Sequence, residues 1–275
     1  MPEGDTIFRA ARTLHRAFAG RVVTHFESVF PALTRVHDDT PITGRTVDSV
    51  RSSGKHLLMN FSGDLTLRTH MRMNGSWHIY RAGERWQRPR RDMRIVVSTA
   101  QYVAVGFSIP VAEWLRTTEL RRSRDLARLG PDLLAEQFDS DEAFRRIRSR
   151  ASEPVAEVLL DQRVLAGIGN VYKSEVLFAC GVYPFAEVGK LSDEQIRALL
   201  TTSRKFLRAN VTEGLAAMTT YLGFRRTTRH DDPSARLWVY GRAGDSCRRC
   251  GSAILIDKRG TDARLTYWCP RCQAG

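Results

Sequence analysis

The sequence predicts an α+β protein of several domains. A β-sandwich with an anchoring helix comes first, a helical domain with a helix–two-turn–helix second, and a cysteine-rich β-hairpin last. Three observations lead to this fold class. The 275 residues exceed one typical domain, short apolar runs between glycines fill residues 21–107, and later helical patterns are followed by two cysteine pairs. We expect domains at 1–122, 131–235 and 236–275, with a linker at 123–130.

The composition is that of a soluble globular protein, with 42% hydrophobic and 27% charged residues. No apolar run reaches the length of about 18 residues that a membrane span needs. The first residues do not have the pattern of a secretory signal, so we expect a cytoplasmic, nucleoid-associated protein. The formal net charge of +13 and the pI of 10.1 favour a polyanionic partner, nucleic acid before a membrane.

The chain opens with Met-Pro-Glu-Gly, and an initiator methionine before a small residue is usually removed. Pro2 would then be an N-terminal secondary amine. An α-amino group has a pKa of about 8, against about 10.4 for lysine, so part of it is uncharged and nucleophilic at neutral pH. Such an amine can form an iminium ion with an electrophilic carbon, and Glu3 can transfer protons there. The alternative is an ordinary frayed terminus.

Residues 5–20 form the predicted anchoring helix, with Ile7, Ala11 and Leu14 on one apolar face and Gly20 at its end. This helix would hold Pro2 in a defined place. Strands are then predicted at residues 22–26, 46–50, 56–60, 65–69, 77–80, 94–98 and 102–107. Many short strands separated by turns favour a sandwich or a barrel.

Two turns in this β region hold candidate site residues. Lys55 follows Gly54 at the start of an apolar strand. It is either a solvated turn residue or, if the turn faces Pro2, a phosphate ligand or auxiliary acid. Met73 lies in a glycine-bounded turn. Its side chain either folds back into the core or is a wedge between DNA bases.

Helices are predicted at residues 140–150, 153–162, 171–180 and 192–210. Between the second and third lies Gly-Ile-Gly-Asn, ending at Asn170. Glycines let the backbone approach a ligand, and amides at a helix N-terminus bind phosphate. The alternative is a tight turn in which Asn170 only caps the helix. Residues 224–230 are basic and rich in threonine, which predicts either a loop over a pocket or a disordered segment.

The last module contains two C-x-x-C pairs in a chain without a secretory signal, which favours a metal site over disulfides. Four thiolates in two such knuckles predict one closed, structural zinc ion. The ligands would be Cys247, Cys250, Cys269 and Cys272. A β-hairpin is expected at residues 254–257 and 265–268, with Arg264 near its tip. Cys180 stands alone and is expected to pack within a helical domain.

The order of these features resembles the Fpg/Nei family of bifunctional DNA glycosylases across essentially the whole chain. The resemblance implies a base-excision repair enzyme that binds damaged duplex DNA, with AP lyase activity by β,δ-elimination, and we expect a monomer. It implies catalytic roles for Pro2 as nucleophile and Glu3 as acid/base, with Lys55 contacting a phosphate near the lesion. Its implied DNA-binding residues are Asn170 and Arg264 at phosphates, and Met73 as the wedge.

Two departures from the family pattern bear on specificity. Asp5-Thr6 stands where many members have a second glutamate. Residues 107–111 do not contain the Arg-x-Phe-type element with which 8-oxoguanine-specific members read the orphaned cytosine. With its Pro-Glu-Gly opening, the chain resembles endonuclease VIII more, so we expect excision of oxidised pyrimidines. The alternatives are an 8-oxoguanine/formamidopyrimidine glycosylase and a non-catalytic zinc-dependent DNA-binding protein.

Overall fold

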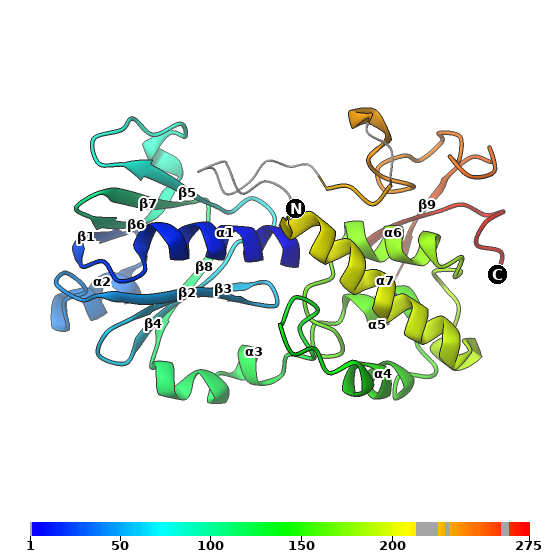
Figure 1. The fold of residues 1–275 in the computed structure, drawn as a ribbon, viewed down its shortest axis with the longest axis horizontal. Helices are drawn as coiled ribbons and strands as arrows, with labels where there is room; N and C mark the ends of the chain where they lie inside the picture. Colours follow the sequence, from blue (N-terminus) through cyan, green and yellow to red (C-terminus); the bar gives the residue numbers. More distant parts are fainter. Residues whose placement is uncertain (1, 213–224, 229–231, 260–263) are drawn as a thin grey trace. The chain divides into compact units, whose positions relative to one another are not determined.

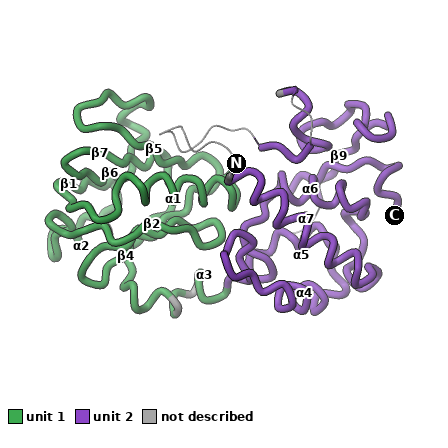
Figure 2. The backbone as a smooth tube through the Cα atoms, in the orientation of Figure 1, with its two compact units in different colours: residues 1–128, 214–222 green, residues 129–213, 223–275 purple. Residues whose placement is uncertain are grey.

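The computed structural model describes residues 2–212, 225–228, 232–259 and 264–275. Of the predicted loop at 224–230, the structure describes residues 225–228, and residues 260–263 of the last hairpin lie outside the described residues. The chain divides into two compact units, one of residues 2–128 and one of the described residues from 129 onward (Figure 2). The finer division at 122, 130 and 235 stays a prediction. Within the described ranges, no helix is long and apolar enough to cross a membrane.

The first unit is the predicted sandwich, made of two antiparallel four-stranded sheets (Figure 1). Alternate residues of both sheets, such as Met59 and Ile95, enter one buried cluster, because successive strand side chains point to opposite faces. One sheet has the order β1 (Val23–Ser28), β6 (Met93–Thr99), β7 (Tyr102–Phe107), β5 (Ser76–Arg81). The other has the order β2 (Val47–Ser53), β3 (His56–Phe61), β4 (Leu65–His70), β8 (Val111–Leu115).

Helix α1 (Gly4–Phe18) completes this core. Ile7, Ala11 and Leu14 are buried in the same cluster as the sheet residues, which confirms the predicted apolar face. Because this face is buried against β2 and β3, the helix holds the start of the chain on the sandwich.

The sequence pattern does not predict helix α2 (Pro31–Asp39) or strand β8. Leu33 is the buried residue of α2, so the helix has little apolar periodicity to detect. All five residues of β8 are half-buried, without the alternation that marks a strand. The first unit also has the short helices η1 (Arg90–Asp92), η2 (Thr117–Arg122) and α3 (Arg124–Ala127).

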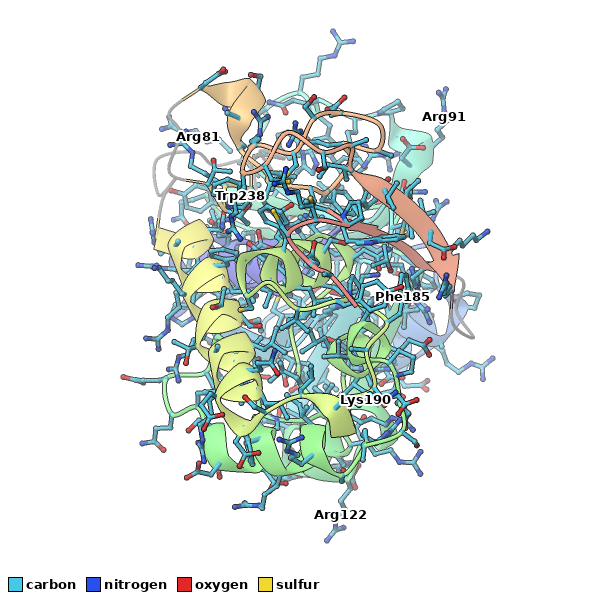
Figure 3. All side chains as sticks on the ribbon, turned by 90° about the vertical axis from the view of Figure 1, so that its right-hand side faces the viewer. Arg81, Arg91, Arg122, Phe185, Lys190 and Trp238 are labelled. Atoms are coloured by element: carbon cyan, nitrogen blue, oxygen red, sulfur yellow. The ribbon has the colours of Figure 1, made fainter. Side chains whose placement is uncertain are left out.

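The second unit has the predicted helices and the predicted hairpin. The helices are α4 (Ser140–Arg148), α5 (Val155–Leu160), α6 (Asn170–Ala179) and α7 (Asp193–Thr212), with the short η3 (Val188–Lys190) and η4 (Pro233–Ala235). The hairpin consists of β9 (Leu255–Arg259) and β10 (Arg264–Trp268). Phe185 lies beside this hairpin (Figure 3), with its ring centroid 5.2 Å from that of Trp268.

Candidate functional site

The first turn of α1 contains buried carboxylates. Glu3, at the N-cap position, and Asp5 are both fully buried, and Pro2 is half-buried. The Glu3 side chain makes no capping hydrogen bond to α1. Carboxylates are favoured at a helix N-terminus, because the backbone N–H groups there are unpaired and the helix dipole is positive. The two acids next to Pro2 thus occupy a place where the helix stabilises negative charge.

Helix α1 and strand β2 run antiparallel. At the end of the helix, the N–H of Gly20 donates to the carbonyl of Val47, at 2.8 Å. One turn earlier, His15 Nδ1 accepts from the N–H of Val50, at 3.1 Å. The N-terminal end of α1 therefore lies at the same end of the unit as the C-terminal end of β2.

This antiparallel pairing brings Pro2 and Lys55 to one end of the first unit. From His15, the helix extends back to Pro2 by about 20 Å at 1.5 Å per residue. From Val50, the strand extends forward to Lys55 by about 16 Å at 3.3 Å per residue. Figure 1 shows the start of α1 and the β2–β3 turn at this shared end. Lys55 is half-exposed in that turn.

A histidine pair lies at the same end, where β3 and β4 place His56 opposite His70. Their ring centroids are 4.9 Å apart, edge to face. His70 Nδ1 accepts from the N–H of Arg72 at 3.0 Å, so the neutral ring has its proton on Nε2. Burial, followed by the positive charges of Arg72 and Lys55, lowers the pKa of His70 to about 4. His70 is therefore a neutral hydrogen-bond donor beside a lysine at neutral pH.

Arg68 connects this pair to helix α3. Its side chain is 5% exposed, and Nη1 donates to His56 Nδ1 at 3.3 Å and to Asp125 Oδ2 at 2.9 Å. Its Nε lies 2.6 Å from a carboxylate oxygen of Glu113 on β8. Burial, together with smaller effects of His70 and Arg68, lowers the pKa of His56 to about 3.

The turn between β4 and β5 presents Met73. Its side chain is 57% exposed, whereas Met71 is 2% exposed, so Met73 does not fold back into the core. The Gly75 N–H donates to the carbonyl of Met71 at 2.9 Å. A Cβ on Gly75 would lie 2.5 Å from that oxygen, so the turn needs glycine there. Arg72 has a φ of 49°, a left-handed conformation that strains a side-chain-bearing residue.

In the second unit, α6 begins at the predicted turn. Asn170 is its first residue and is 9% exposed. Lys173, one turn later, is 1% exposed, and its Nζ donates to Asn170 Oδ1 at 3.3 Å. The same Nζ donates to the Leu265 carbonyl at 3.0 Å and to Thr266 Oγ1 at 2.8 Å, both on β10. Lys173 therefore joins the Gly-x-Gly-Asn turn to strand β10, which begins at Arg264.

Glu175 lies on the same helix, α6, and contacts a different segment of the chain, residues 238–240. It is fully buried and accepts hydrogen bonds from the backbone N–H groups of Trp238 (2.8 Å), Val239 (2.9 Å) and Tyr240 (2.8 Å). The Thr227 hydroxyl also donates to it. Burial raises the pKa of Glu175, and these four donors oppose that rise. The carboxylate fixes the chain just before the cysteine hairpin.

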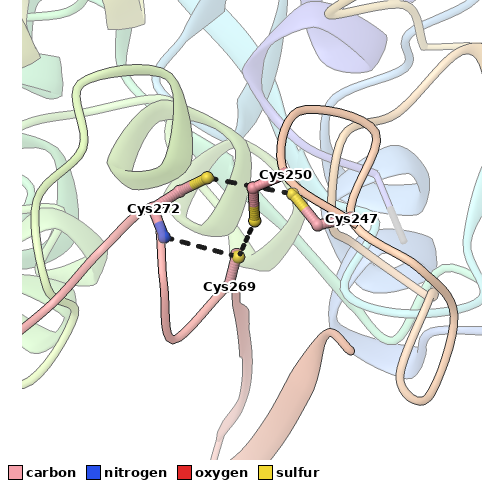
Figure 4. A group of neighbouring side chains, drawn as sticks. All are labelled: Cys247, Cys250, Cys269 and Cys272. Carbon is pink, nitrogen blue, oxygen red and sulfur yellow. Dashed lines mark hydrogen bonds between the residues drawn. The ribbon is translucent and has the colours of Figure 1, made fainter. Parts of the chain in front are cut away.

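The four C-terminal cysteines form the predicted cluster (Figure 4), with all sulfur atoms within 4.8 Å of one another. A tetrahedral zinc site with Zn–S bonds of about 2.3 Å needs S···S distances of about 3.8 Å. Two of the pairs are at 3.9 Å (Cys247–Cys272) and 3.4 Å (Cys250–Cys269), so the group fits the ion. Gln273 secures the second knuckle by accepting from the Cys269 N–H at 3.0 Å and donating to the carbonyl of Val182 at 2.8 Å.

Family models match nearly the whole chain. Residues 1–126 match the formamidopyrimidine-DNA glycosylase N-terminal domain, and residues 129–221 match the H2TH domain of that glycosylase. Residues 244–275 match a zinc finger found in FPG and IleRS. The match to the zinc finger agrees with one structural zinc ion at the four cysteines.

Curated relatives match over the full length. A probable endonuclease 8 2 of Streptomyces coelicolor is 44% identical, covering 100% of this chain and 95% of the relative. The DNA-(apurinic or apyrimidinic site) lyase Nei2 of Mycolicibacterium smegmatis is 38% identical over 99% of both chains. The fold is also that of Lactococcus lactis Fpg bound to abasic-site DNA, with a TM-score of 0.82, 22% identity and full coverage of both chains.

Three residues with a place in the site are absent from the sequence prediction: His70, Lys173 and Glu175. A weak signal for the last two was present. Lys173 and Glu175 interrupt an otherwise apolar helix, and all residues from Asn170 to Phe178 are buried. A charged side chain at a buried position predicts hydrogen-bonding partners elsewhere in the chain, because an unpaired buried charge is costly. The sequence does not show which residues these partners are.

We predict that the histidine pair makes folding sensitive to acid. An unfolded histidine takes up a proton near pH 6.5, but His56 and His70 do so only near pH 3 and pH 4 in the folded protein. The unfolded state thus binds more protons below pH 6.5, and stability falls from pH 6.5 toward pH 4. Between pH 7.5 and pH 5, each histidine should remove about 1 to 2 kcal/mol. Urea unfolding of wild type and His56→Phe measures this, and equal losses in both proteins would contradict it.

We predict that Cys250→Ser loses the zinc ion and with it DNA binding, because the ion supplies the folding free energy of the hairpin. Cys180→Ser is the matched control. Cys180 lies outside the cluster, with its Sγ 3.4 Å from Thr202 Oγ1, so this variant should keep one zinc per chain. Zinc content and near-ultraviolet circular dichroism measure the outcome. Full DNA affinity in zinc-free Cys250→Ser would refute the structural role.

Proposed function

The chain belongs to the formamidopyrimidine-DNA glycosylase and endonuclease VIII (Fpg/Nei) family, and from this premise we propose that it is a DNA glycosylase with AP lyase activity in base-excision repair. The observation that carries the proposal is the first turn of α1, where Pro2 adjoins the buried Glu3 at the same end of the unit as Lys55. Damaged DNA is the proposed substrate. We further propose that the protein is monomeric and cytoplasmic.

The proposed chemistry begins at Pro2 after removal of Met1. The uncharged amine attacks C1′ of the damaged nucleotide, so that an N–C1′ bond forms as the bond to the base breaks, and the departing base takes up the proton that the proline nitrogen loses. Glu3 donates a proton to the ring oxygen, and the sugar opens to an iminium ion. The iminium withdraws electrons and makes the neighbouring C2′–H acidic. Successive β- and δ-elimination then release the 3′ and 5′ phosphates.

Phosphate contacts would hold the flanking backbone. In the first unit, Lys55 offers an ammonium, and His70 offers an Nε2–H donor beside it. Since His70 stays neutral, it adds a directed donor without a second charge that would repel the lysine. In the second unit, we assign phosphate contacts to Asn170, at the start of α6, and to Arg264, at the start of β10.

We assign the wedge role to Met73. A base turned out of the duplex leaves a gap in the stack, which an apolar side chain can fill. The 57% exposed fraction of Met73 supports this assignment, because an apolar side chain at a loop tip has no packing role there. The strained Arg72 and the glycine requirement at residue 75 give the turn a fixed shape.

We propose oxidised pyrimidines as the main lesions. The stretch in which 8-oxoguanine-specific members have an arginine places Phe107 and Ile109 inward, both fully buried. Ser108 between them is in a left-handed turn, with a φ of 49°. This stretch therefore offers no guanidinium to read the cytosine opposite the lesion.

We predict a covalent adduct through Pro2. Borohydride reduces an iminium to a stable amine, so incubation with abasic duplex should add the mass of the DNA to the protein. A variant that keeps a residue before Pro2 should give no adduct, because its proline nitrogen is an amide. Lys55→Ala is the control and should still form the adduct, with a higher KM. Intact-mass spectrometry measures both, and an adduct on the extended chain would exclude Pro2.

We predict that thymine glycol is excised at least about tenfold faster than 8-oxoguanine opposite cytosine, since one bidentate base contact is worth about tenfold or more. Single-turnover assays on duplexes of identical flanking sequence measure the ratio. Faster release of 8-oxoguanine would replace the proposed substrate class while leaving the lyase proposal intact.

A further inference from the structure

We infer that Lys173 is a positioning residue for the phosphate contacts of the second unit. It fixes which end of the Asn170 amide faces the DNA, and it holds the strand that begins with Arg264. This inference rests on the proposed function, in which Asn170 and Arg264 bind phosphates.

The contacts of Lys173 use its full donor capacity. An ammonium has three N–H donors. Oxygen acceptors lie at 2.8 Å (Thr266 Oγ1), 3.0 Å (Leu265 carbonyl) and 3.3 Å (Asn170 Oδ1). The side chain is 1% exposed, so water does not compete for these bonds. A buried charge with matched acceptors resists any movement that would remove one of them.

The bond to Asn170 sets the orientation of its amide. The side chain of asparagine ends in an acceptor oxygen and a donor NH₂ group, which can exchange places by a flip. A phosphate needs donors. Because Lys173 can only donate, it binds the oxygen and leaves the NH₂ group of Asn170 for the anion. With an apolar residue at 173, both orientations of the amide become available, and the wrong one presents an oxygen to the phosphate.

The hydrogen bonds from Lys173 to β10 fix the position of the backbone next to Arg264. Leu265 and Thr266 follow Arg264 directly, and the Tyr267 N–H donates to Ser174 Oγ on α6 at 3.3 Å. The start of β10 is thus held against α6. Lys173, Arg264 and Thr266 all line one cavity of about 490 Å³, beside Gln162 of the turn before α6. The positive charge of Lys173 therefore lies in the wall of the space that Arg264 borders.

The test is a double-mutant cycle on the full-length, zinc-loaded protein. The variants are Lys173→Met, Asn170→Ala and the double variant, with Lys173→Arg as the conservative control. The probe is a duplex that contains a tetrahydrofuran abasic analogue, which is bound but not cleaved. Binding is measured by fluorescence anisotropy at one fixed salt concentration, because phosphate contacts depend strongly on salt. Zinc content of each variant is determined in parallel.

We expect Lys173→Met and Asn170→Ala each to raise Kd about tenfold, and the double variant to raise it no further than about tenfold, because both changes remove the same phosphate contact. Lys173→Arg should stay within about threefold of wild type, since it still donates to the Asn170 oxygen. In Lys173→Met, a larger change in Kd than in the rate of adduct formation at saturating abasic DNA separates a role in phosphate binding from a general loss of the fold.

Two outcomes would overturn the inference. One is a normal Kd in Lys173→Met. The other is a Kd raised about a hundredfold in the double variant, which is the product that two independent contacts would give. If Lys173→Met loses zinc, the same cycle is run with Lys173→Ala, which also removes every N–H donor of the side chain at this position, and the same two outcomes decide. Failure of the proposed function is distinct from these, because wild type would then neither bind the analogue tightly nor form a borohydride adduct.

Discussion

Lys173 and Glu175 lie two residues apart on α6 and are both buried, so this helix brings opposite charges into the interior of the second unit. An unpaired charge cannot be left in such a place, since its desolvation cost exceeds what packing supplies. Each charge therefore needs partners from elsewhere in the chain. Lys173 finds them on β10, and Glu175 finds them on the backbone of residues 238–240. The path of the C-terminal segment around α6 follows from these requirements.

The zinc site and α6 hold the hairpin from two sides. The four cysteines close the base of the hairpin, and Gln273 ties the second knuckle to Val182, three residues after the end of α6. Lys173 and Ser174 hold β10 itself. A short hairpin on its own is marginally stable. The metal and the buried polar bonds together make it a defined platform for Arg264.

The first unit also contains a buried charge that needs partners, that of Arg68. This buried cation is surrounded by Asp125, Glu113 and His56, which come from α3, β8 and β3. The histidine pair next to it stays uncharged, which leaves the positive charge of Lys55 at the end of the sheet where Pro2 also lies. In both units, a buried cation with partners from several elements thus lies next to a turn to which we assign a phosphate contact.

The elements that depend on local pattern could be predicted from the order of the residues. The sandwich strands, α1 and the helices of the second unit follow from periodicity, and the zinc ligands follow from the spacing of Cys247, Cys250, Cys269 and Cys272. It did not reveal α2 or β8, whose burial is too uneven to give a period. It also left open whether the Met73 side chain was buried or exposed. The folded structure answers that question, and it also identifies His70, Lys173 and Glu175 as residues of the site. Periodicity reports which residues face inward, but the partner of a buried polar group comes from a distant segment, and its identity exists only once the chain has folded.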